Sequence, residues 1–138
     1  MEIRKAHIND MDQIIILNKV VDYDNPDDFF KESIDLGRVL VACDNNFVIW
    51  FLLYQELWWN TPILSLIKIH PDFYRQGVGS KLLNEFESIL RGDWRKSYIS
   101  STMSNNIWAQ TFHHKSGFVS IGELKMNCGD EKFYKKSL

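Results

Sequence analysis

The sequence predicts an α/β domain, because two kinds of segment alternate along its 138 residues. Some runs of β-branched and apolar residues have the length of strands, and other segments repeat apolar residues at the spacing of a helix. In residues 63–90 a strand-like run leads through a glycine-rich turn directly into such a helix. A chain of this length can bury a substantial core, so we expect residues 1–138 to form a single domain.

The expected order of elements is β-α-α-β-β-β-α-β-α-β-β. Strands are predicted at residues 3–6, 38–43, 47–58, 63–69, 97–103, 118–126 and 131–136. Helices are predicted at residues 9–21 with Asn9 as the N-cap, at 27–36, from the glycine turn to 90, and through residue 115 with Asn105 or Asn106 as the N-cap. Turns rich in asparagine, glycine and proline separate these elements, and Asn45-Asn46 is expected to close a hairpin.

The turn after the central strand is the strongest functional signal from the residues alone. Pro71 ends strand pairing because proline has no N–H to donate, and Gly77 and Gly79 stand just before the amphipathic helix. Glycines allow a phosphate to approach closely, and the free N–H groups of a first helical turn attract an anion. A tight turn without a ligand would use the same residues. A dinucleotide fingerprint is excluded, since Leu82 stands where its third glycine belongs, and so is a P-loop.

Composition excludes several classes of function. A net charge of −2 and a pI near 6.1 give no general attraction to nucleic acid or to an anionic membrane. No signal peptide, transmembrane run or lipidation motif is recognised. The two cysteines, Cys43 and Cys128, are too few and too separated for a disulfide framework or a metal site. We therefore expect reduced thiols in a cytoplasmic protein.

Residues 70–83, HPDFYRQGVGSKLL, resemble motif A of the GNAT acyltransferase superfamily, (R/Q)-x-x-G-x-(G/A). Tyr74 departs from the arginine or glutamine of the first motif position. In this family the loop amides hold the pyrophosphate of acetyl-CoA, and the pantetheine arm pairs with the preceding strand. The residues that the resemblance assigns to acetyl-CoA are Ile67, Ile69, Arg75, Gln76, Gly77, Val78, Gly79, Ser80 and Asn106.

Residues 106–118 resemble the closing helix of the same family, N-x-x-A-x-x-x-Y-x-x-x-G-F. Asn106, Ala109, Gly117 and Phe118 match this pattern, but His113 replaces the tyrosine that often protonates the leaving thiolate. An imidazole can donate a proton and can also act as a base. The alternative is that His113 is a solvated residue near the end of a helix, where a cation is favourable.

The resemblance implies the GNAT fold, a mixed sheet of about seven strands with helices on both faces. It also implies an N-acetyltransferase reaction, in which a primary amine attacks the thioester of acetyl-CoA directly, without a metal. Glu56 is the candidate general base, and a water held by Ser65 or by backbone carbonyls is the alternative. A catalytically silent CoA-binding sensor or regulatory domain remains a second hypothesis, and a domain that uses its aromatic surface for association is a third.

The acceptor pocket is expected to lie between the loop joining the first two helices and the turn before the central strand. Carboxylates and aromatic rings there would suit a small cationic amine, or a peptide N-terminus. The residues assigned to the acceptor are Asp24, Asp27, Asp28, Trp58 and Trp59. The alternative is that the aspartates cap the second helix and the tryptophans pack. Dimers are common in this superfamily, so a homodimer stays open, whereas nucleic acid and membrane are not expected as partners.

Overall fold

The structure, a computed structural model, describes residues 1–20, 27–127 and 129–138. It confirms the predicted element order and the α/β class, with seven strands in one sheet of order β1-β2-β3-β4-β5-β7-β6. The strands are β1 (Glu2–Lys5), β2 (Val39–Asp44), β3 (Phe47–Leu57), β4 (Thr61–Ile69), β5 (Ser97–Met103), β6 (Val119–Met126) and β7 (Gly129–Ser137). The helices are α1 (Met11–Val20), α2 (Asp27–Asp35), α3 (Val78–Gly92) and α4 (Ile107–Lys115), with 3-10 turns η1 (Ile8–Asp10) and η2 (Pro71–Phe73).

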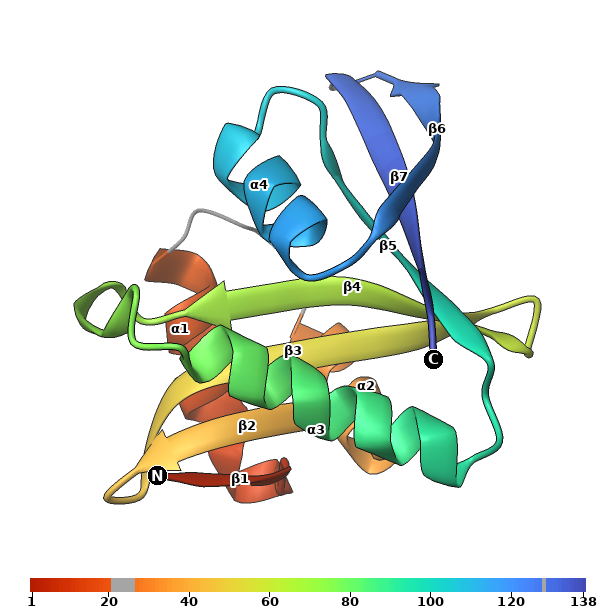
Figure 1. Cartoon of the computed structure of the whole chain (residues 1–138). Coiled ribbons are helices and arrows are strands. Elements are labelled where there is room, and N and C mark those ends of the chain that lie inside the picture. Colours follow the sequence, from red (N-terminus) through yellow and green to blue (C-terminus); the bar gives the residue numbers. More distant parts are fainter. Residues whose placement is uncertain (21–26, 128) are drawn as a thin grey trace.

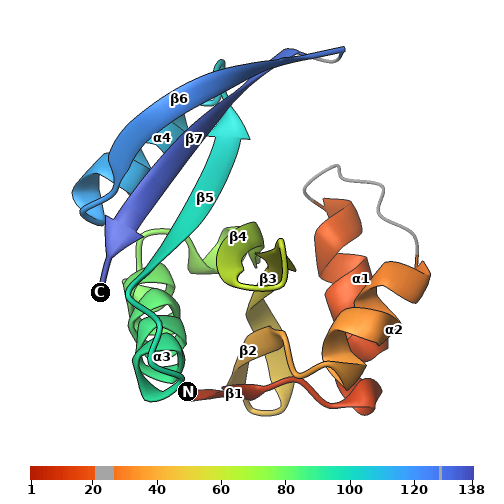
Figure 2. The ribbon, with the colours of Figure 1, turned by 90° about the vertical axis from the view of Figure 1, so that its right-hand side faces the viewer.

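Helices cover both faces of the part of the sheet formed by β1 to β4. Helix α3 lies on one face, and α1 with α2 lies on the other (Figure 2). Strand β3 is buried from Val48 to Tyr54 because it is covered on both sides, and its apolar residues divide between two core clusters. Trp50, Leu52 and Tyr54 pack toward α3, whereas Val48, Phe51 and Leu53 pack toward α1 and α2. None of the described helices is long and apolar enough to span a membrane.

The sheet opens between β4 and β5, which are parallel neighbours. Their pairing is limited to Ile63 with Ile99 and Leu64 with Ser100. The next residue of β4, Ser65, is a bulge, because Leu66 pairs with Leu53 and Leu64 pairs with Tyr54 on β3. Beyond this point β4 continues toward α3 while β5 leaves with β7 and β6, so the two groups of strands diverge (Figure 1).

Two local predictions need correction at the element ends. Asn9 is not the N-cap of the first helix, because it lies inside the 3-10 turn η1 that precedes α1. The polar contacts of that turn come instead from Asp10, whose carboxylate accepts the His7 N–H at 2.7 Å and binds Arg4 in two contacts at 2.8 and 3.0 Å. Trp58 belongs to the turn after β3 rather than to the strand, since its φ of 49° is left-handed. The Asn45-Asn46 hairpin turn is confirmed, with both φ angles positive.

Candidate active site

The divergence of β4 and β5 creates a cleft of about 690 Å³. Its walls come from the open part of β4, from β5, from the first turn of α3 and from one side of α4. Among the residues that line it are Trp50, Ser65, Ile67, Lys68, Ile69, Arg75, Gly77, Gly79, Ser80, Ser100, Asn106, Trp108, Phe112, His113 and Glu131. The glycine turn before α3 and the helix that begins after Asn106 carry the two sequence motifs. They are far apart in the chain, yet both face this cleft.

The glycine turn ends this cleft with unpaired backbone donors. Gly77 is the N-cap of α3 and has a φ of 72°, a left-handed conformation that glycine adopts without steric cost. The first bond of the helix runs from the Lys81 N–H to the Gly77 carbonyl at 3.3 Å. The N–H groups of Val78, Gly79 and Ser80 precede that bond and have no acceptor within the helix, and the helix dipole makes this end positive. This end of the cleft suits a phosphate.

Gly79 has a second reason to be glycine. An ideal Cβ on Gly79 would lie 2.6 Å from Cη2 of Trp50, which is closer than side-chain carbons approach one another. The indole of Trp50 is buried beneath the start of α3 and also lines the cleft. The absence of a side chain at Gly79 therefore lets the helix begin directly against the sheet, which places its N–H groups at the end of the cleft.

The edge of β4 that faces the cleft is open beyond Leu64, because β5 pairs with β4 only at Ile63 and Leu64. Ile67 and Ile69 both line the cleft from this stretch. Unpaired strand edges bind extended groups that carry amides, by backbone hydrogen bonds. A pantetheine arm is extended and has two amides, so the open edge and the glycine turn together fit the shape and chemistry of CoA.

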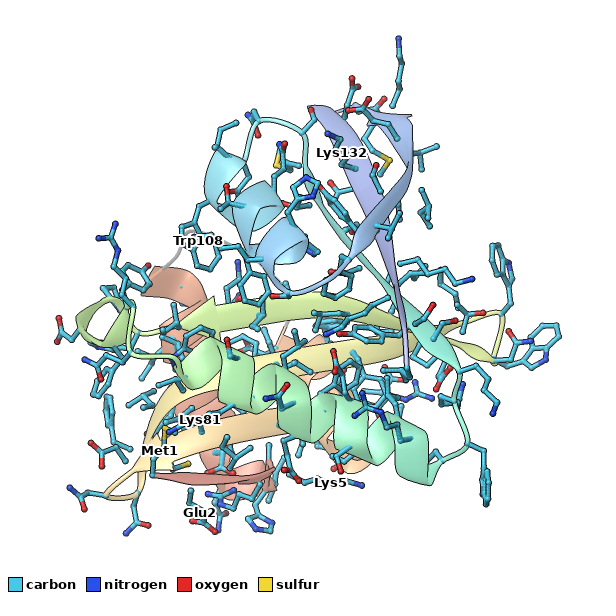
Figure 3. The ribbon with its side chains drawn as sticks, viewed as in Figure 1. Met1, Glu2, Lys5, Lys81, Trp108 and Lys132 are labelled. Carbon is cyan, nitrogen blue, oxygen red and sulfur yellow. The ribbon has the colours of Figure 1, made fainter. Side chains whose placement is uncertain are left out.

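Helix α4 forms the opposite wall. The side chain of Asn106 accepts the Ala109 N–H at 3.0 Å, so it caps α4, and the same residue lines the cleft. Trp108 stacks on Phe112, with ring centroids 5.7 Å apart and an angle of 8° between the planes. Trp108 projects from α4 on the side of the β4 end (Figure 3), and both rings make this wall apolar.

His113 is buried, with only 4% of its surface exposed, so it is not a solvated helix residue. Its Nδ1 lies 2.6 Å from the carbonyl oxygen of Ala109, and its Nε2 lies 2.7 Å from Oγ of Ser100. Its ring stacks on Tyr134 at 4.4 Å between centroids and meets the edge of Phe118 at 4.9 Å. Burial lowers the pKa of His113 below its usual value, which favours the neutral imidazole at neutral pH.

Two of the residues assigned to acetyl-CoA do not line the cleft. The amide of Gln76 reaches back to the carbonyl of Asp72 at 3.4 Å, and the side chain of Val78 is buried in the core. Their backbone N–H groups remain in the turn and in the first turn of α3. Arg75 lines the cleft and is the cationic side chain of the turn, although its φ of 63° is left-handed.

Glu56 lies outside the cleft, and its placement does not support a role as general base. Arg95 binds both of its carboxylate oxygens, with Nη2 to Oε1 at 2.6 Å and Nη1 to Oε2 at 3.2 Å. The same guanidinium donates to the carbonyl of Asn60 at 2.9 Å. Through these contacts Arg95 holds the segment before β5 against the end of β3 and the turn that follows it.

The acceptor residues are not brought together at the cleft. Trp58 and Trp59 lie in the β3–β4 turn, 73% and 88% exposed, and neither lines the cleft. They precede β4, whereas the glycine turn follows its other end, so the length of the strand separates them (Figure 1). Asp27 and Asp28 are exposed in the first turn of α2, and Asp24 lies outside the described residues.

Several cleft residues escaped the sequence analysis. Ser100 lies with Tyr98 and Thr102 on the buried side of β5. A serine at a buried strand position is unusual, and this was the feature of the sequence that could have identified it. Trp50 and Trp108 were not singled out, because the sequence around them does not distinguish a tryptophan that lines the cleft from an exposed one such as Trp58. Lys68 and Glu131 line the cleft from β4 and β7, and burial lowers the pKa of Lys68.

Comparisons with known proteins agree with this geometry. The Acetyltransferase (GNAT) domain family matches residues 35–120, which is more than half of the chain. No curated protein matches the chain in sequence. Among solved structures, Ard1 from Thermoplasma volcanium has a TM-score of 0.91 at 18% identity, covering 99% of this chain and 97% of that one.

Two further solved structures superpose on nearly the whole chain. A GNAT family acetyltransferase from Bacillus cereus ATCC 10987 is 28% identical, with a TM-score of 0.82 over 99% of this chain and 96% of that one. The PaiA N-acetyltransferase from Thermoplasma acidophilum, solved with coenzyme A, is 18% identical, with a TM-score of 0.82 over 99% of this chain and 98% of that one. With a family match over most of its length and both family motifs facing one cleft, this chain belongs to the GNAT acetyltransferase family.

Proposed function

We propose that this protein transfers an acetyl group from acetyl-CoA to a primary amine. The observation that carries the proposal is that the N-terminus of α3, the open edge of β4 and the buried Ser100–His113 pair all line the same cleft. The first would hold the phosphates, the second the pantetheine, and the third lies where the strands join. A neighbour of this fold, PaiA, was solved with coenzyme A, which supports the same co-substrate here.

The residues proposed to bind acetyl-CoA divide by chemistry. Backbone N–H groups from Gly77 to Ser80 bind the pyrophosphate, with Arg75 as a nearby cation. Ile67 and Ile69 offer backbone groups to the pantetheine amides. Asn106 caps α4 at the same cleft. These contacts position the thioester beside the point where β4 and β5 meet, near Ser100.

The chemistry requires a neutral amine. An alkylamine with a pKa of about 10.4 must lose a proton before it attacks, which costs roughly 4.6 kcal/mol at pH 7 by the relation of about 1.36 kcal/mol per unit. A group that accepts this proton therefore raises the rate. Glu56 is held by Arg95 and is not proposed for this role. His113, bonded to Ser100, is a titratable group at the place where β4 and β5 separate.

For the acceptor we propose a small amine or a peptide N-terminus. The carboxylates of Asp27 and Asp28 lie on α2, outside the cleft lining, while Lys68 places a cation within it. The cleft therefore gives less support to a cationic acceptor than the sequence indicated. We also propose that the chain acts as one domain in the cytoplasm, with Cys43 as a buried free thiol.

The second candidate is a CoA-binding domain without turnover, favoured by the replacement of the family's tyrosine by His113. One experiment separates the two. Acetyl-CoA is titrated by calorimetry, and thiol release is then followed with a panel of small amines and short peptides. Binding with amine-dependent thiol release supports the enzyme, binding without release with every acceptor supports the sensor, and no binding contradicts both.

A further inference from the structure

His113 and Ser100 form a buried pair that the family pattern does not describe. Ser100 is 2% exposed and His113 is 4% exposed, yet both line the cleft. Their contact of 2.7 Å between Oγ and Nε2 joins β5 to α4. The imidazole is held on its other side by the Ala109 carbonyl at 2.6 Å from Nδ1. The ring therefore has two fixed partners and a single orientation.

The partners decide where the protons are. A carbonyl oxygen can only accept, so the contact with Ala109 places the N–H of the ring on Nδ1. Burial lowers the pKa of His113 and keeps the ring neutral at neutral pH, so Nε2 carries a lone pair. Ser100 must then donate its hydroxyl proton to Nε2. The remaining lone pairs of Ser100 Oγ are left to accept a proton from a group in the cleft.

The surroundings of the ring contain few other groups that titrate. Tyr134 stacks on it from β7, and burial raises the pKa of that phenol, so it stays protonated. Phe112 and Phe118 are apolar neighbours, and His114, next along α4, lowers the pKa of His113 further. Lys68 from β4 and Glu131 from β7 are the charged side chains of the cleft lining on the strands opposite and beside Ser100.

Ser100 also marks a defined place in the cleft. It pairs with Leu64, and this is the last residue pair of the ladder between β4 and β5. The bulge at Ser65 follows at once on β4. A linear arm that lies along the open edge of β4 with its phosphates at α3 ends at this junction. The reactive end of a thioester and the attacking amine would therefore meet beside the Ser100 hydroxyl.

We propose that Ser100 and His113 form a proton relay for acetyl transfer, with Ser100 as the catalytic contact and His113 as the group behind it. The proposal rests on the acetyltransferase function proposed above. As the amine nitrogen forms its bond to the acetyl carbon, its proton passes to Ser100 Oγ while the serine proton passes to His113 Nε2. The bond between carbon and sulfur then breaks with its electron pair on sulfur, and the imidazolium returns a proton through Ser100 to that thiolate.

The relay suits the acidities of the groups. A serine hydroxyl does not ionise alone at neutral pH, whereas an imidazole can take up a proton. The nitrogen that gives up this proton is attached to a carbon bearing oxygen and sulfur, so it is more acidic than the free alkylammonium ion. The imidazolium, with its lowered pKa, is more acidic than a thiol with a pKa of about 8.5, so the return of the proton to sulfur is downhill. Once the amine has given up its ammonium proton to solvent, the transfer neither gains nor loses a proton, because the proton that leaves the neutral amine ends on sulfur.

The test compares Ser100→Ala, Ser100→Thr and His113→Gln with two controls, Ser97→Ala on the same strand and His114→Gln beside the histidine. We expect Ser100→Ala and His113→Gln to lower kcat by about 10²–10⁴-fold while the affinity for acetyl-CoA stays within threefold. Ser100→Thr keeps the hydroxyl and should retain kcat within tenfold. Both controls should match the wild type, and calorimetry with each variant reports binding separately from turnover.

The pH profile and the ring nitrogens supply readouts that a structural role would not move. The acidic limb of the wild-type kcat profile should lie below pH 6.5 and should vanish in His113→Gln. Nitrogen NMR of the free protein should report the Nδ1-protonated tautomer. Full kcat in Ser100→Ala, an Nε2-protonated ring, or an acetyl group found on Ser100 by mass spectrometry would overturn the relay. Wild-type protein that binds acetyl-CoA but releases no thiol with any acceptor overturns the proposed function and the relay with it.

Discussion

Trp50 lies so close to Gly79 that a Cβ on the glycine would come within 2.6 Å of Cη2 of the indole. The ring is buried in the core under α3 and has little room to move. The glycine thus serves the packing of the helix as well as the proposed approach of a phosphate. At Gly77 a Cβ would meet no atom within 4 Å, so there glycine is required by the backbone, whose φ is 72°, and not by packing.

Gly79→Ala should therefore destabilise the protein by about 1–3 kcal/mol, the usual cost of overpacking a well-filled core. Without the contact, alanine in a helix would be favoured over glycine by roughly 0.5–1 kcal/mol. Gly92→Ala is the matched control, because Gly92 is the last residue of α3, its φ is not positive, and no atom lies within 4 Å of a Cβ there. Urea denaturation of both variants measures the difference. Equal stabilities would show that the Trp50 indole moves to make room for the added methyl group.

Ser80→Glu tests the phosphate end of the cleft without disturbing the core. Ser80 is exposed in the first turn of α3, where a carboxylate stabilises a helix by about 0.3–1 kcal/mol. The same charge would repel the pyrophosphate, so we expect the affinity for acetyl-CoA to fall by about 10–100-fold. Ser80→Gln, of equal size but uncharged, should bind within a few fold of wild type. If calorimetry gives the glutamate variant unchanged affinity, the phosphates bind elsewhere.

The two motifs could be found from the sequence because they are local. Gly77 needs its backbone conformation and Asn106 needs its cap within four residues of chain, so each leaves a pattern at fixed spacing. The order of strands and helices was predictable for the same reason, since periodicity is a local property.

The acid–base assignments were less predictable because they depend on partners far apart in the chain. Glu56 looked like a free carboxylate, and only the fold brings Arg95 to it from 39 positions away. Ser100 carried no motif, and its meaning comes from His113 on the next helix. Trp50 lies in β3 and Trp58 in the turn that follows it, but Trp50 is buried and lines the cleft whereas Trp58 is exposed and does not.

His113 should make stability depend on pH in a defined window. Its folded-state pKa is below the unfolded value of about 6.5, so the unfolded chain binds more protons between these two values. The contribution of the neutral ring is fully present above pH 6.5 and is lost as the pH falls toward the folded pKa, with a slope of up to about 1.4 kcal/mol per pH unit. Denaturation between pH 7.5 and 5 should show this slope in the wild type and in His114→Gln. In His113→Gln the slope should be absent, and a slope equal to that of the wild type would assign it to another group.

Glu87 links α3, which begins at one end of the cleft, to strands β5 and β7. Its carboxylate, on α3, accepts the Tyr98 hydroxyl at 2.7 Å and lies 2.6 Å from the Lys136 ammonium, with Arg91 at 3.6 Å. Tyr98 precedes Ser100 by two positions on β5, and Lys136 follows Tyr134 by two on β7. The helix that begins at the glycine turn is therefore bonded to β5, which carries Ser100 of the proposed relay, and to β7, which carries the Tyr134 ring that stacks on His113.

Glu87→Ala should cost about 3–5 kcal/mol, because it leaves the Lys136 ammonium and the Tyr98 hydroxyl without their buried partner. Lys136→Met should cost less, since the carboxylate keeps Tyr98 and Arg91 as partners and the lysine side chain is already 21% exposed. In the double variant Glu87→Ala/Lys136→Met the ammonium that would lack its carboxylate is removed as well, so the loss should be smaller than the sum of the two single losses. Chemical denaturation of the four proteins closes this cycle. Strict additivity would mean that the ion pair contributes nothing beyond the hydrogen bond to Tyr98, and that the packing of α3 alone holds the two halves together.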